Sequence, residues 1–547
     1  MHQDMPILRL GVHTTAVEAR LRAWEEQDVV ARLWAKDHTL WAAEPVPEIS
    51  DRLGWLTLPG AMRPEVPALE EFAAEVAADG VTRVVLLGMG GSSLAPEVFA
   101  RTLGHRLGYP ELLVLDSTHP GAVRAVDRRT DPAATLFLIS SKSGTTIEPL
   151  SFFHHCWARV SAATPHPGRH FAAITDPGTS LAGLAEARGF RRVFRAAPDV
   201  GGRFSALSHF GLVPAALIGA DVSGLLDRAE QMAEACRRPP AENPGCILGA
   251  ALGEMARAGR DKATFLVSPS LASFPAWVEQ LVAESTGKGG TGIVPIAEET
   301  AGTPAAYGSD RCFVYLSCPG DADEAQAAAV DALEAAGQPV IRLHLNQPSG
   351  LTAEMFRAEV AVAMAGSVLG IHPVDQPDVQ LAKELAARAM AGEEGGDPIP
   401  VVHAGEGPAL SAALDGLLRQ ARPGDYFALQ AFVEPTPEAV AALQRLRHRV
   451  RDRFRLATTL GFGPRFLHST GQLHKGGPGA ALFLQVVDDP RPDLPVPGTG
   501  YSFGRLVAAQ ADGDFRALAA RGRRLQRVTL GSDPREGLAA LKASEPS

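Results

Sequence analysis

Short apolar runs alternate with segments of helical spacing from Thr82 onward. The first of these runs lie at 84–89, 112–116, 135–140, 171–175 and 193–196. A strand that reads as a continuous apolar run is buried on both faces, which is typical of a parallel sheet covered by helices on each side. The pattern therefore predicts a doubly wound α/β unit in this part of the chain.

The same alternation predicts two further α/β units. A second series of runs lies at 263–268, 292–296, 312–317 and 339–345, between helical segments that include 322–336 and 351–369. A third series lies at 426–433, 481–487 and 523–530, beyond a Gly, Pro and acid-rich stretch at 391–400 that we interpret as a linker. A chain of 547 residues exceeds what one hydrophobic core supports. We expect a helical lead-in at 1–80, α/β domains at 81–235 and 236–392, and a C-terminal α/β region at 393–547.

Charge, cysteine content and the lack of long apolar runs argue against several classes of protein. The formal net charge is -10, and the basic run at 445–455 has the helical spacing of a solvated face, so we expect no nucleic-acid partner. The five cysteines are scattered without paired metal-ligand spacing, which indicates reduced thiols in a cytoplasmic protein. The N-terminus lacks a signal-peptide pattern, and no apolar run approaches eighteen residues, so we expect neither secretion nor a membrane span.

A cluster of hydroxyl residues follows one predicted strand, at the sheet edge where ligands bind in doubly wound folds. The stretch LISSKSGTTIEP, at 138–149, places Ser141, Ser143, Thr145 and Thr146 with Lys142 and Gly144 at a strand-to-helix junction. Hydroxyls, a lysine and the unpaired amides of a helix N-terminus attract an anion. Helix capping would account for one hydroxyl and not four. We predict a phosphate monoester site, because the spacing of a nucleotide P-loop is absent.

Two neighbouring features have both a structural and a functional interpretation. The turn GMGGSS at 88–93 lets the backbone approach a ligand, with Ser92 as a donor, but glycines also serve a tight turn without a ligand. Glu148 lies one turn inside the next helix, where it faces the rest of the ligand or is an ordinary first-turn acid.

Charged residues in two later segments suggest chemistry. Arg203 follows Gly201 and Gly202, as either a salt-bridged loop residue or a fixed cation for a developing oxyanion. Glu284 ends a predicted helix, where the helix dipole opposes a carboxylate, so a functional reason is favoured. We expect the apolar residues at 281–283 to raise the pKa of Glu284 toward neutrality, as suits a general base.

In their order along the chain, these segments resemble glucose-6-phosphate isomerases. The motifs are GMGGSSLAP at 88–96, SSKSGTTIEP at 140–149, GGRFSALSHFGL at 201–212, ESTGKGG at 284–290 and HPVDQPDVQLAK at 372–383. The stretch GPRFLHSTGQLHKGGP at 463–478 and the third α/β region are more specifically similar to the isomerase half of bifunctional transaldolase/glucose-6-phosphate isomerases. The transaldolase half itself is absent from this sequence.

The resemblance implies a fold, an activity and partners. The implied fold is a pair of tandem sugar-isomerase (SIS) domains with doubly wound parallel sheets, plus the helical lead-in and the C-terminal extension. The implied activity is the interconversion of glucose 6-phosphate and fructose 6-phosphate through a cis-enediol(ate), in glycolysis and gluconeogenesis, without cofactor or metal. The alternatives are an isomerase that also accepts mannose 6-phosphate and a non-catalytic SIS-type sugar-phosphate sensor. A homodimer is the family expectation, and a separately encoded transaldolase remains open as a partner.

The resemblance also implies roles for individual residues. Arg203 sits by the reacting carbons, Glu284 is the base, and Lys383 helps to open the sugar ring. The residues implied to bind substrate are Gly91, Ser92, Ser141, Lys142, Ser143, Thr146, Glu148, Gly202, Gln376 and His474.

One departure concerns the ring-opening histidine. In the common isomerases it lies between the catalytic Glu and the Lys motif, but the interval 285–372 has no matching Gln-His segment. The most similar pattern comes after the Lys motif and contains His468, Gln472 and His474. We expect His468 in this role, with His474 as the alternative, from the same chain or from a neighbouring subunit. Either histidine could instead cap a loop.

Overall fold

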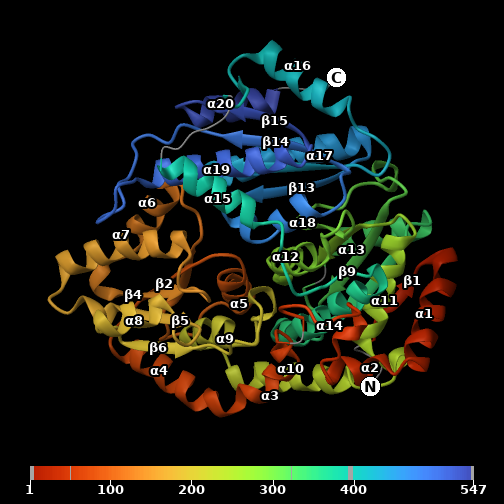
Figure 1. Cartoon of the computed structure of the whole chain (residues 1–547), viewed down its shortest axis with the longest axis horizontal. Coiled ribbons are helices and arrows are strands. Elements are labelled where there is room, and N and C mark those ends of the chain that lie inside the picture. Colours follow the sequence, from red (N-terminus) through yellow and green to blue (C-terminus); the bar gives the residue numbers. More distant parts are fainter. Residues whose placement is uncertain (1–4, 50, 322, 392–397, 544–547) are drawn as a thin grey trace.

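The computed structural model describes residues 5–49, 51–321, 323–391 and 398–543. Within them, the first predicted α/β unit is a parallel five-stranded sheet, drawn in orange to yellow in Figure 1. Its strands are β2 (Arg83–Gly88), β3 (Glu111–Leu115), β4 (Thr135–Ser140), β5 (Phe171–Thr175) and β6 (Arg192–Arg195). The order β3-β2-β4-β5-β6 reverses between β2 and β4, and such a switch point is where doubly wound sheets bind ligands.

The second sheet is parallel except for one short strand from the N-terminus. Its parallel strands are β7 (Lys262–Val267), β8 (Val294–Ile296), β9 (Arg311–Ser317) and β10 (Val340–His344). The N-terminal strand β1 (Ile7–Arg9) pairs antiparallel with β10. The prediction of a purely helical lead-in was therefore wrong at this point, because a three-residue edge strand is too short to show any periodicity.

The third sheet is parallel throughout its described strands. They are β11 (Val401–His403), β12 (Tyr426–Phe432), β13 (Ala457–Phe462), β14 (Ala481–Val487) and β15 (Arg524–Thr529). The order β11-β15-β14-β12-β13 reverses between β12 and β14. Strand β13 was not predicted, since its sequence ATTLGF lacks the continuous apolar run of its neighbours.

Helices connect and cover the sheets, as the doubly wound pattern requires. The N-terminal helices are α1 (Thr14–Glu26), α2 (Val29–Trp34), α3 (Leu58–Ala61) and α4 (Val66–Ala78). The first unit has α5 (Leu94–Leu103), α6 (Pro120–Arg129), α7 (Ile147–Ala163), α8 (Ser180–Ala187) and α9 (His209–Leu217). The second has α10 (Val222–Ala235), α11 (Pro244–Arg257), α12 (Phe274–Thr286), α13 (Glu324–Ala335) and α14 (Leu351–Leu369). The remaining helices are α15 (Gln380–Ala391), α16 (Gly407–Leu418), α17 (Pro437–Phe454), α18 (Gly471–Gly476), α19 (Phe503–Ala520) and α20 (Pro534–Ala543).

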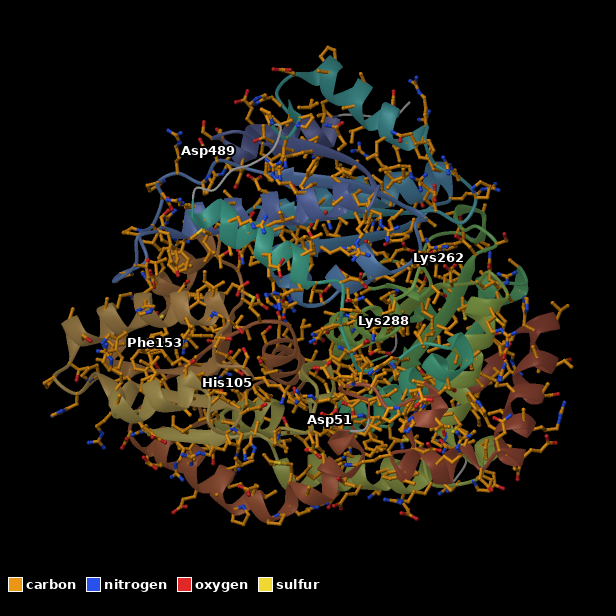
Figure 2. The ribbon with its side chains drawn as sticks, viewed as in Figure 1. Asp51, His105, Phe153, Lys262, Lys288 and Asp489 are labelled. Carbon is orange, nitrogen blue, oxygen red and sulfur yellow. The ribbon has the colours of Figure 1, made fainter. Side chains whose placement is uncertain are left out.

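One apolar core joins the first two units, and the third unit has a core of its own with smaller clusters at its contacts with both other units. One continuous cluster of buried side chains runs from Leu10 to Val374 and includes residues of the lead-in and of both units. The third unit packs around a separate cluster that includes Phe427, Leu443 and Leu484. Side chains fill the space between the ribbons in Figure 2, where Phe153 of α7 packs edge-on against Phe171 of β5 at a centroid distance of 5.6 Å.

Buried arginines join the third unit to the second. In the basic run at 445–455, Arg447 and Arg451 are buried rather than solvated, which corrects the interpretation of this run as a solvated face. Arg447 donates to the carbonyl of Ala297 at 2.7 Å, and Arg451 donates to that of Thr300 at 2.5 Å. Because the guanidinium groups of Arg447 and Arg451 contact the second unit, these arginines hold the third unit against the second.

Helix α15 packs along α19, so the chain reaches the third unit before residue 392. The two helices lie side by side in Figure 1. The predicted linker at 391–400 falls mainly on residues 392–397, which lie outside the described residues.

Two sequence-based expectations concern the whole chain. All five cysteines are buried free thiols, as expected. In the described part of the chain, no helix is both long enough and apolar enough to cross a membrane.

Candidate active site

A cavity of about 350 Å³ lies where the three α/β units meet. The first unit contributes the carboxyl ends of β2 and β4, the second the end of α12, and the third the segment before α18. The predicted residues that line it are Gly91, Ser92, Ser141, Lys142, Ser143, Thr146, Gly202, Arg203, Glu284, Gln376, Lys383 and His468. Pockets of this size hold small molecules of metabolite size.

The hydroxyl cluster at the end of β4 has the geometry of an anion site. Thr146 occupies the N-cap position of α7, yet its side chain makes no capping hydrogen bond. Its Oγ1 instead accepts a hydrogen bond from Ser141 Oγ at 3.2 Å and lies 3.4 Å from Ser143 Oγ. The first amides of the 17-residue helix α7 thus lie beside grouped hydroxyls, an arrangement that suits a phosphate.

Asp176 and Arg52, which the sequence did not reveal, flank this cluster. Asp176 Oδ2 accepts a hydrogen bond from Lys142 Nζ at 2.6 Å, so the lysine charge is paired before any ligand binds. Burial lowers the pKa of Lys142, and its pairing with Asp176 opposes this shift. Arg52, from the turn-rich N-terminal segment, lines the same cavity and supplies a second cation.

Glycines allow the loops of different units to touch. A Cβ on Gly91 would lie 2.1 Å from the carbonyl oxygen of Gly202, so the turn after β2 and the loop of Arg203 are in backbone contact. Gly90 has a positive φ of 52°, and a Cβ there would lie 2.5 Å from the carbonyl oxygen of His468. Only glycine permits both approaches, which explains why this turn is glycine-rich.

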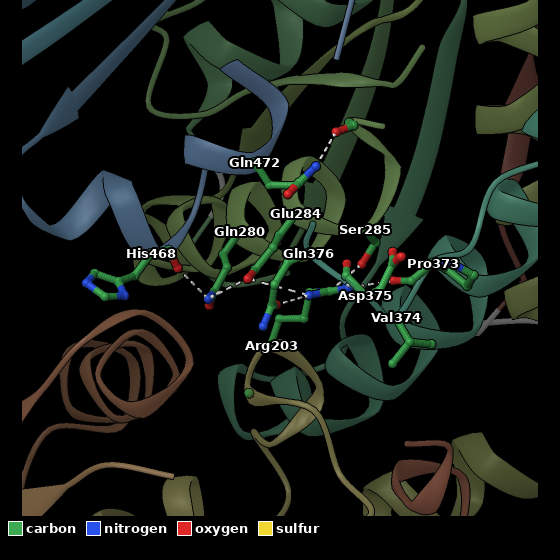
Figure 3. A network of polar contacts seen from close by, with 12 residues as sticks. Arg203, Gln280, Glu284, Ser285, Pro373, Val374, Asp375, Gln376, His468 and Gln472 are labelled. Carbon is green, nitrogen blue, oxygen red and sulfur yellow. Dashed lines mark hydrogen bonds and ion pairs between the residues drawn. The ribbon is translucent and has the colours of Figure 1, made fainter. Parts of the chain in front are cut away.

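Arg203 is buried, 3% exposed, and fully engaged (Figure 3). Its Nη2 donates to the carbonyls of Pro373 and Asp375 at 2.7 and 2.9 Å, and its Nε donates to Ser285 Oγ at 2.8 Å. Its Nη1 donates to Gln376 Oε1 at 2.8 Å. Burial lowers the pKa of the guanidinium, although nearby carboxylates oppose the shift. The guanidinium is therefore a rigidly held cation at the cavity wall.

Glu284 lies beside Arg203 at the end of α12. Its Oε1 is 3.5 Å from Arg203 Nη1, and its Oε2 accepts a hydrogen bond from Gln280 Nε2 at 3.1 Å. The expectation of apolar surroundings was wrong for the carboxylate itself, because both contacts are polar. Residues 281–283 are buried on α12. Gln280, which the sequence did not single out, also donates to the carbonyl of His468 at 2.8 Å.

His468 enters the cavity from the same chain. Its Nε2 lies 2.9 Å from Glu148 Oε1, and its side chain is 19% exposed. Glu148 is buried and lies behind His468 instead of lining this cavity. Burial would raise the pKa of Glu148, but His468, a backbone hydrogen bond and the charge of Lys383 together lower it.

A hydrogen-bond chain continues behind Glu148 into the third unit. Gln510 of α19 donates to Glu148 Oε1 at 2.7 Å, and Thr118 Oγ1 donates to Gln510 Oε1 at 2.7 Å. Each of these three side chains is buried, so water does not compete for the bonds. The His468–Glu148 pair is thus held from outside the cavity.

The structure does not place His474 in the cavity, in contrast to the expectation. It lies on α18, and this helix turns it into the core of the third unit. Its Nδ1 is 3.1 Å from Gln430 Nε2, and its ring packs against Phe466 and Phe483. Burial lowers the pKa of His474 well below its usual value, so a neutral core histidine results.

The segment that carries Gln376 and Lys383 is held by two buried side chains. Lys288 donates to the carbonyl of His372 at 2.5 Å and to Asp375 Oδ1 at 2.7 Å. Gln472 donates to Asp378 Oδ2 at 2.7 Å and to the carbonyl of Gly287 at 3.0 Å.

Lys383 follows on α15 and lines the cavity. It also lines an adjoining cavity of about 820 Å³ between α15 and α7. Within the described residues, no group of three or more His, Cys, Asp or Glu side chains is placed to hold a metal ion.

Comparisons with known proteins agree with these motifs. The sequence model of the phosphoglucose isomerase family matches residues 71–309. A glucose-6-phosphate isomerase of Rubrobacter xylanophilus is 30% identical over 422 residues, an alignment that covers 68% of this chain and 95% of that protein. One of Trichormus variabilis is 30% identical over 277 residues, which cover 48% of this chain and 50% of that protein.

Solved structures show the same fold. A hypothetical protein from Thermus thermophilus has a TM-score of 0.62 and 26% identity, covering 71% of this chain and all of that one. A glucose-6-phosphate isomerase from Chlamydia trachomatis has a TM-score of 0.55 at 19% identity, covering 69% of this chain and 86% of that one. The predicted α/β fold with doubly wound parallel sheets is confirmed. By its motifs, its fold and its relatives, the chain belongs to the phosphoglucose isomerase (glucose-6-phosphate isomerase) family.

Proposed function

We propose that this chain is an aldose–ketose isomerase that interconverts glucose 6-phosphate and fructose 6-phosphate in glycolysis and gluconeogenesis. One observation carries the proposal. A single cavity has grouped hydroxyls at a helix N-terminus on one wall and a carboxylate beside a fixed guanidinium on another. The first wall suits a phosphate, and the second suits proton transfer next to a developing negative charge.

The phosphate anchors the substrate. In this proposal Ser141, Ser143 and Thr146 donate to the phosphate oxygens, with Ser92 and the amides of Gly91 and α7 alongside. Lys142 and Arg52 add positive charge. Binding energy at this remote end fixes the sugar carbons relative to the carboxylate, which makes the proton transfer effectively intramolecular.

Glu284 moves the proton between C2 and C1. It takes the proton from one carbon and returns it to the other, so the carboxylate is regenerated in each cycle. Arg203, with Gly202 beside it, faces the enediolate oxygen, and the cation is held by bonds that need no rearrangement during the reaction. Gln280 and Gln376 orient Glu284 and Arg203 through hydrogen bonds.

His468 and Lys383 open the sugar ring. The Nε2–H of His468 donates to Glu148, which leaves Nδ1 as the ring nitrogen that can exchange a proton with the sugar. The Glu148 carboxylate stabilises the imidazolium that forms when His468 accepts this proton. Lys383 reaches the cavity from α15. Between them, His468 and Lys383 exchange protons with the ring oxygen and the C1 hydroxyl of the sugar.

The decisive assay starts from fructose 6-phosphate and follows both aldose products by proton NMR. Formation of glucose 6-phosphate by the native chain, and its loss in Glu284→Gln, supports the proposal. Simultaneous formation of mannose 6-phosphate would instead assign dual specificity. Binding of fructose 6-phosphate without either product would assign a sugar-phosphate sensor.

The organisation of the chain follows from the same proposal. We propose SIS domains over 81–235 and 236–392 between the lead-in and the C-terminal region, in a cytoplasmic homodimer. Light scattering at several concentrations tests the dimer, and a transaldolase added to the assay tests for a functional partner.

A further inference from the structure

A third cavity, of about 700 Å³, lies at the carboxyl edge of the third sheet. It shares no lining residue with the cavity of Glu284 and His468. In Figure 2, Asp489 at this edge lies well away from Lys288 beside the isomerase site. The proposed isomerase reaction makes no use of this space.

The cavity lies at a switch point. Val433 and Glu434 follow β12, and Asp488 and Asp489 follow β14, and these are the strands between which the order of the third sheet reverses. In the first sheet, the equivalent position between β2 and β4 lines the isomerase cavity. Doubly wound sheets bind ligands at this position because the loops diverge there.

Asp488 is a buried carboxylate with only one oxygen satisfied. Its side chain is 1% exposed, and its Oδ1 lies 3.2 Å from His119 Nε2. His119 Nδ1 accepts a hydrogen bond from the amide of Gly121, so the proton must be on Nε2 and points to Asp488. Among the described residues, Asp488 Oδ2 has no hydrogen-bond partner. A buried carboxylate oxygen without a donor is costly, and a ligand hydroxyl or amine would relieve that cost.

A second carboxylate, that of Glu434, is half-buried beside Asp488. It packs against the N-terminus of α6, where a Cβ on Gly121 would lie 2.1 Å from its Oε2. The first unit therefore closes this side of the cavity with His119, Gly121 and Arg124. Both carboxylates accept hydrogen bonds and donate none.

Exposed charged side chains of both signs also line the cavity. They are the cations Arg445, Arg535 and Lys542 and the carboxylates Glu438, Asp489 and Asp533. Apolar residues, among them Leu530 and Leu538, line the cavity as well.

We propose that this cavity binds a phosphorylated polyol, either a nucleotide or a sugar phosphate. Its vicinal hydroxyls donate to Asp488 and Glu434, and its phosphate is bound by Arg445, Arg535 and Lys542. Hydrogen bonds in which one partner is charged are the strong ones, so both sets of contacts contribute to affinity.

The two sources of this chemistry are separated by counting bound ligand per chain. In one arm, AMP and ADP are titrated calorimetrically into protein held in an equilibrium mixture of glucose and fructose 6-phosphate, which fills the isomerase site. In the other, equilibrium dialysis counts labelled sugar phosphate. One nucleotide per chain identifies a nucleotide, and two sugar phosphates per chain identify a sugar phosphate. No nucleotide together with one sugar phosphate overturns the proposal.

Variants test whether the nucleotide or second sugar phosphate binds in this cavity. Arg445→Glu with Arg535→Glu changes exposed residues only and should weaken this additional binding about tenfold or more, since two charge-assisted contacts are lost. Asp488→Asn should weaken it as well. Arg22→Glu with Arg128→Glu makes the same charge change elsewhere on the surface and should have no effect. Isomerase kcat/KM should stay unchanged in both double variants, and additional binding that survives the Arg445/Arg535 change would overturn the assignment.

Discussion

The first and second α/β units have the same strand order around their switch points. They differ in what the loops that follow those strands do. In the first unit, the ends of β2 and β4 line a cavity. In the second unit, the ends of β7 and β9 bond to each other: Ser268 Oγ accepts from the amide of Cys318 at 2.9 Å, and Asp321 accepts from the amide of Ser270. The same topology therefore gives an open binding site in one unit and a closed, self-bonded edge in the other.

The second unit contributes to the active site by another route, the end of α12. Glu284 and Ser285 lie there, and Lys288 follows in the next loop. In the proposed mechanism the first unit binds the substrate and the second carries the proton transfer. Topology determines where loops meet, and the residues in those loops determine what each unit does.

If the second unit carries the chemistry, Glu284→Gln should have the largest effect. We expect kcat to fall about 10³-fold with little change in KM, because general-base catalysis is lost while the phosphate contacts remain. A coupled assay with glucose-6-phosphate dehydrogenase measures both constants. A variant with near-native turnover would remove Glu284 from the proposed role.

If the first unit binds the phosphate, Thr146→Ala should act mainly on KM. We expect KM to rise about tenfold, since a hydrogen bond to a charged group typically contributes about 1.5 kcal/mol. Thr146→Ser keeps the hydroxyl and is the matched control. The division between the units would be lost if kcat fell and KM did not move.

Gln510 of the third unit tests whether a residue outside both the phosphate site and the Glu284 site affects the reaction. Gln510→Leu removes a donor to the charged form of Glu148, so the pKa of Glu148 should rise and the acid limb of the kcat/KM profile should move to higher pH. We expect kcat at neutral pH to fall about threefold to tenfold, in line with one buried hydrogen bond.

Thr118→Val is the graded control for this change, because it leaves the bond between Gln510 and Glu148 in place. Its pH profile should move less than that of Gln510→Leu. Identical profiles for the native chain and Gln510→Leu would make the hydrogen-bond chain purely structural.

The last prediction concerns stability and lies in the second unit. Burial, followed by the nearby Arg203, lowers the pKa of Lys288 to about 7. In the unfolded chain a lysine has a pKa of about 10.4, so between these values the unfolded chain binds more protons and stability rises with pH. Urea unfolding at pH 7, 8.5 and 10 should show the native chain gaining stability relative to Lys288→Met, and a constant difference between them would contradict the lowered pKa.

The features predicted from the sequence are contiguous in it. The hydroxyl cluster could be found because its residues follow one buried strand within six positions, and the fold could be found from runs buried on both faces. Arg52, Gln280 and Asp176 were missed because each reaches the cavity from a separate segment without a local signal.

The sequence also left the choice between two histidines open. His468 and His474 lie six residues apart in one motif, and only the packing of α18 against β12 and β14 turns one into the cavity and the other into the core. The motif is positioned by the rest of the third unit, which its buried arginines hold against the second unit. No pattern within residues 463–478 encodes where the two histidines lie.

The origin of His468 within the same chain has a consequence for how the protein works at low abundance. In the proposed mechanism the base, the anchor and the ring-opening group all come from one polypeptide, so two molecules need not meet before either can act. We expect specific activity to stay constant on dilution, even where any association between copies has been lost.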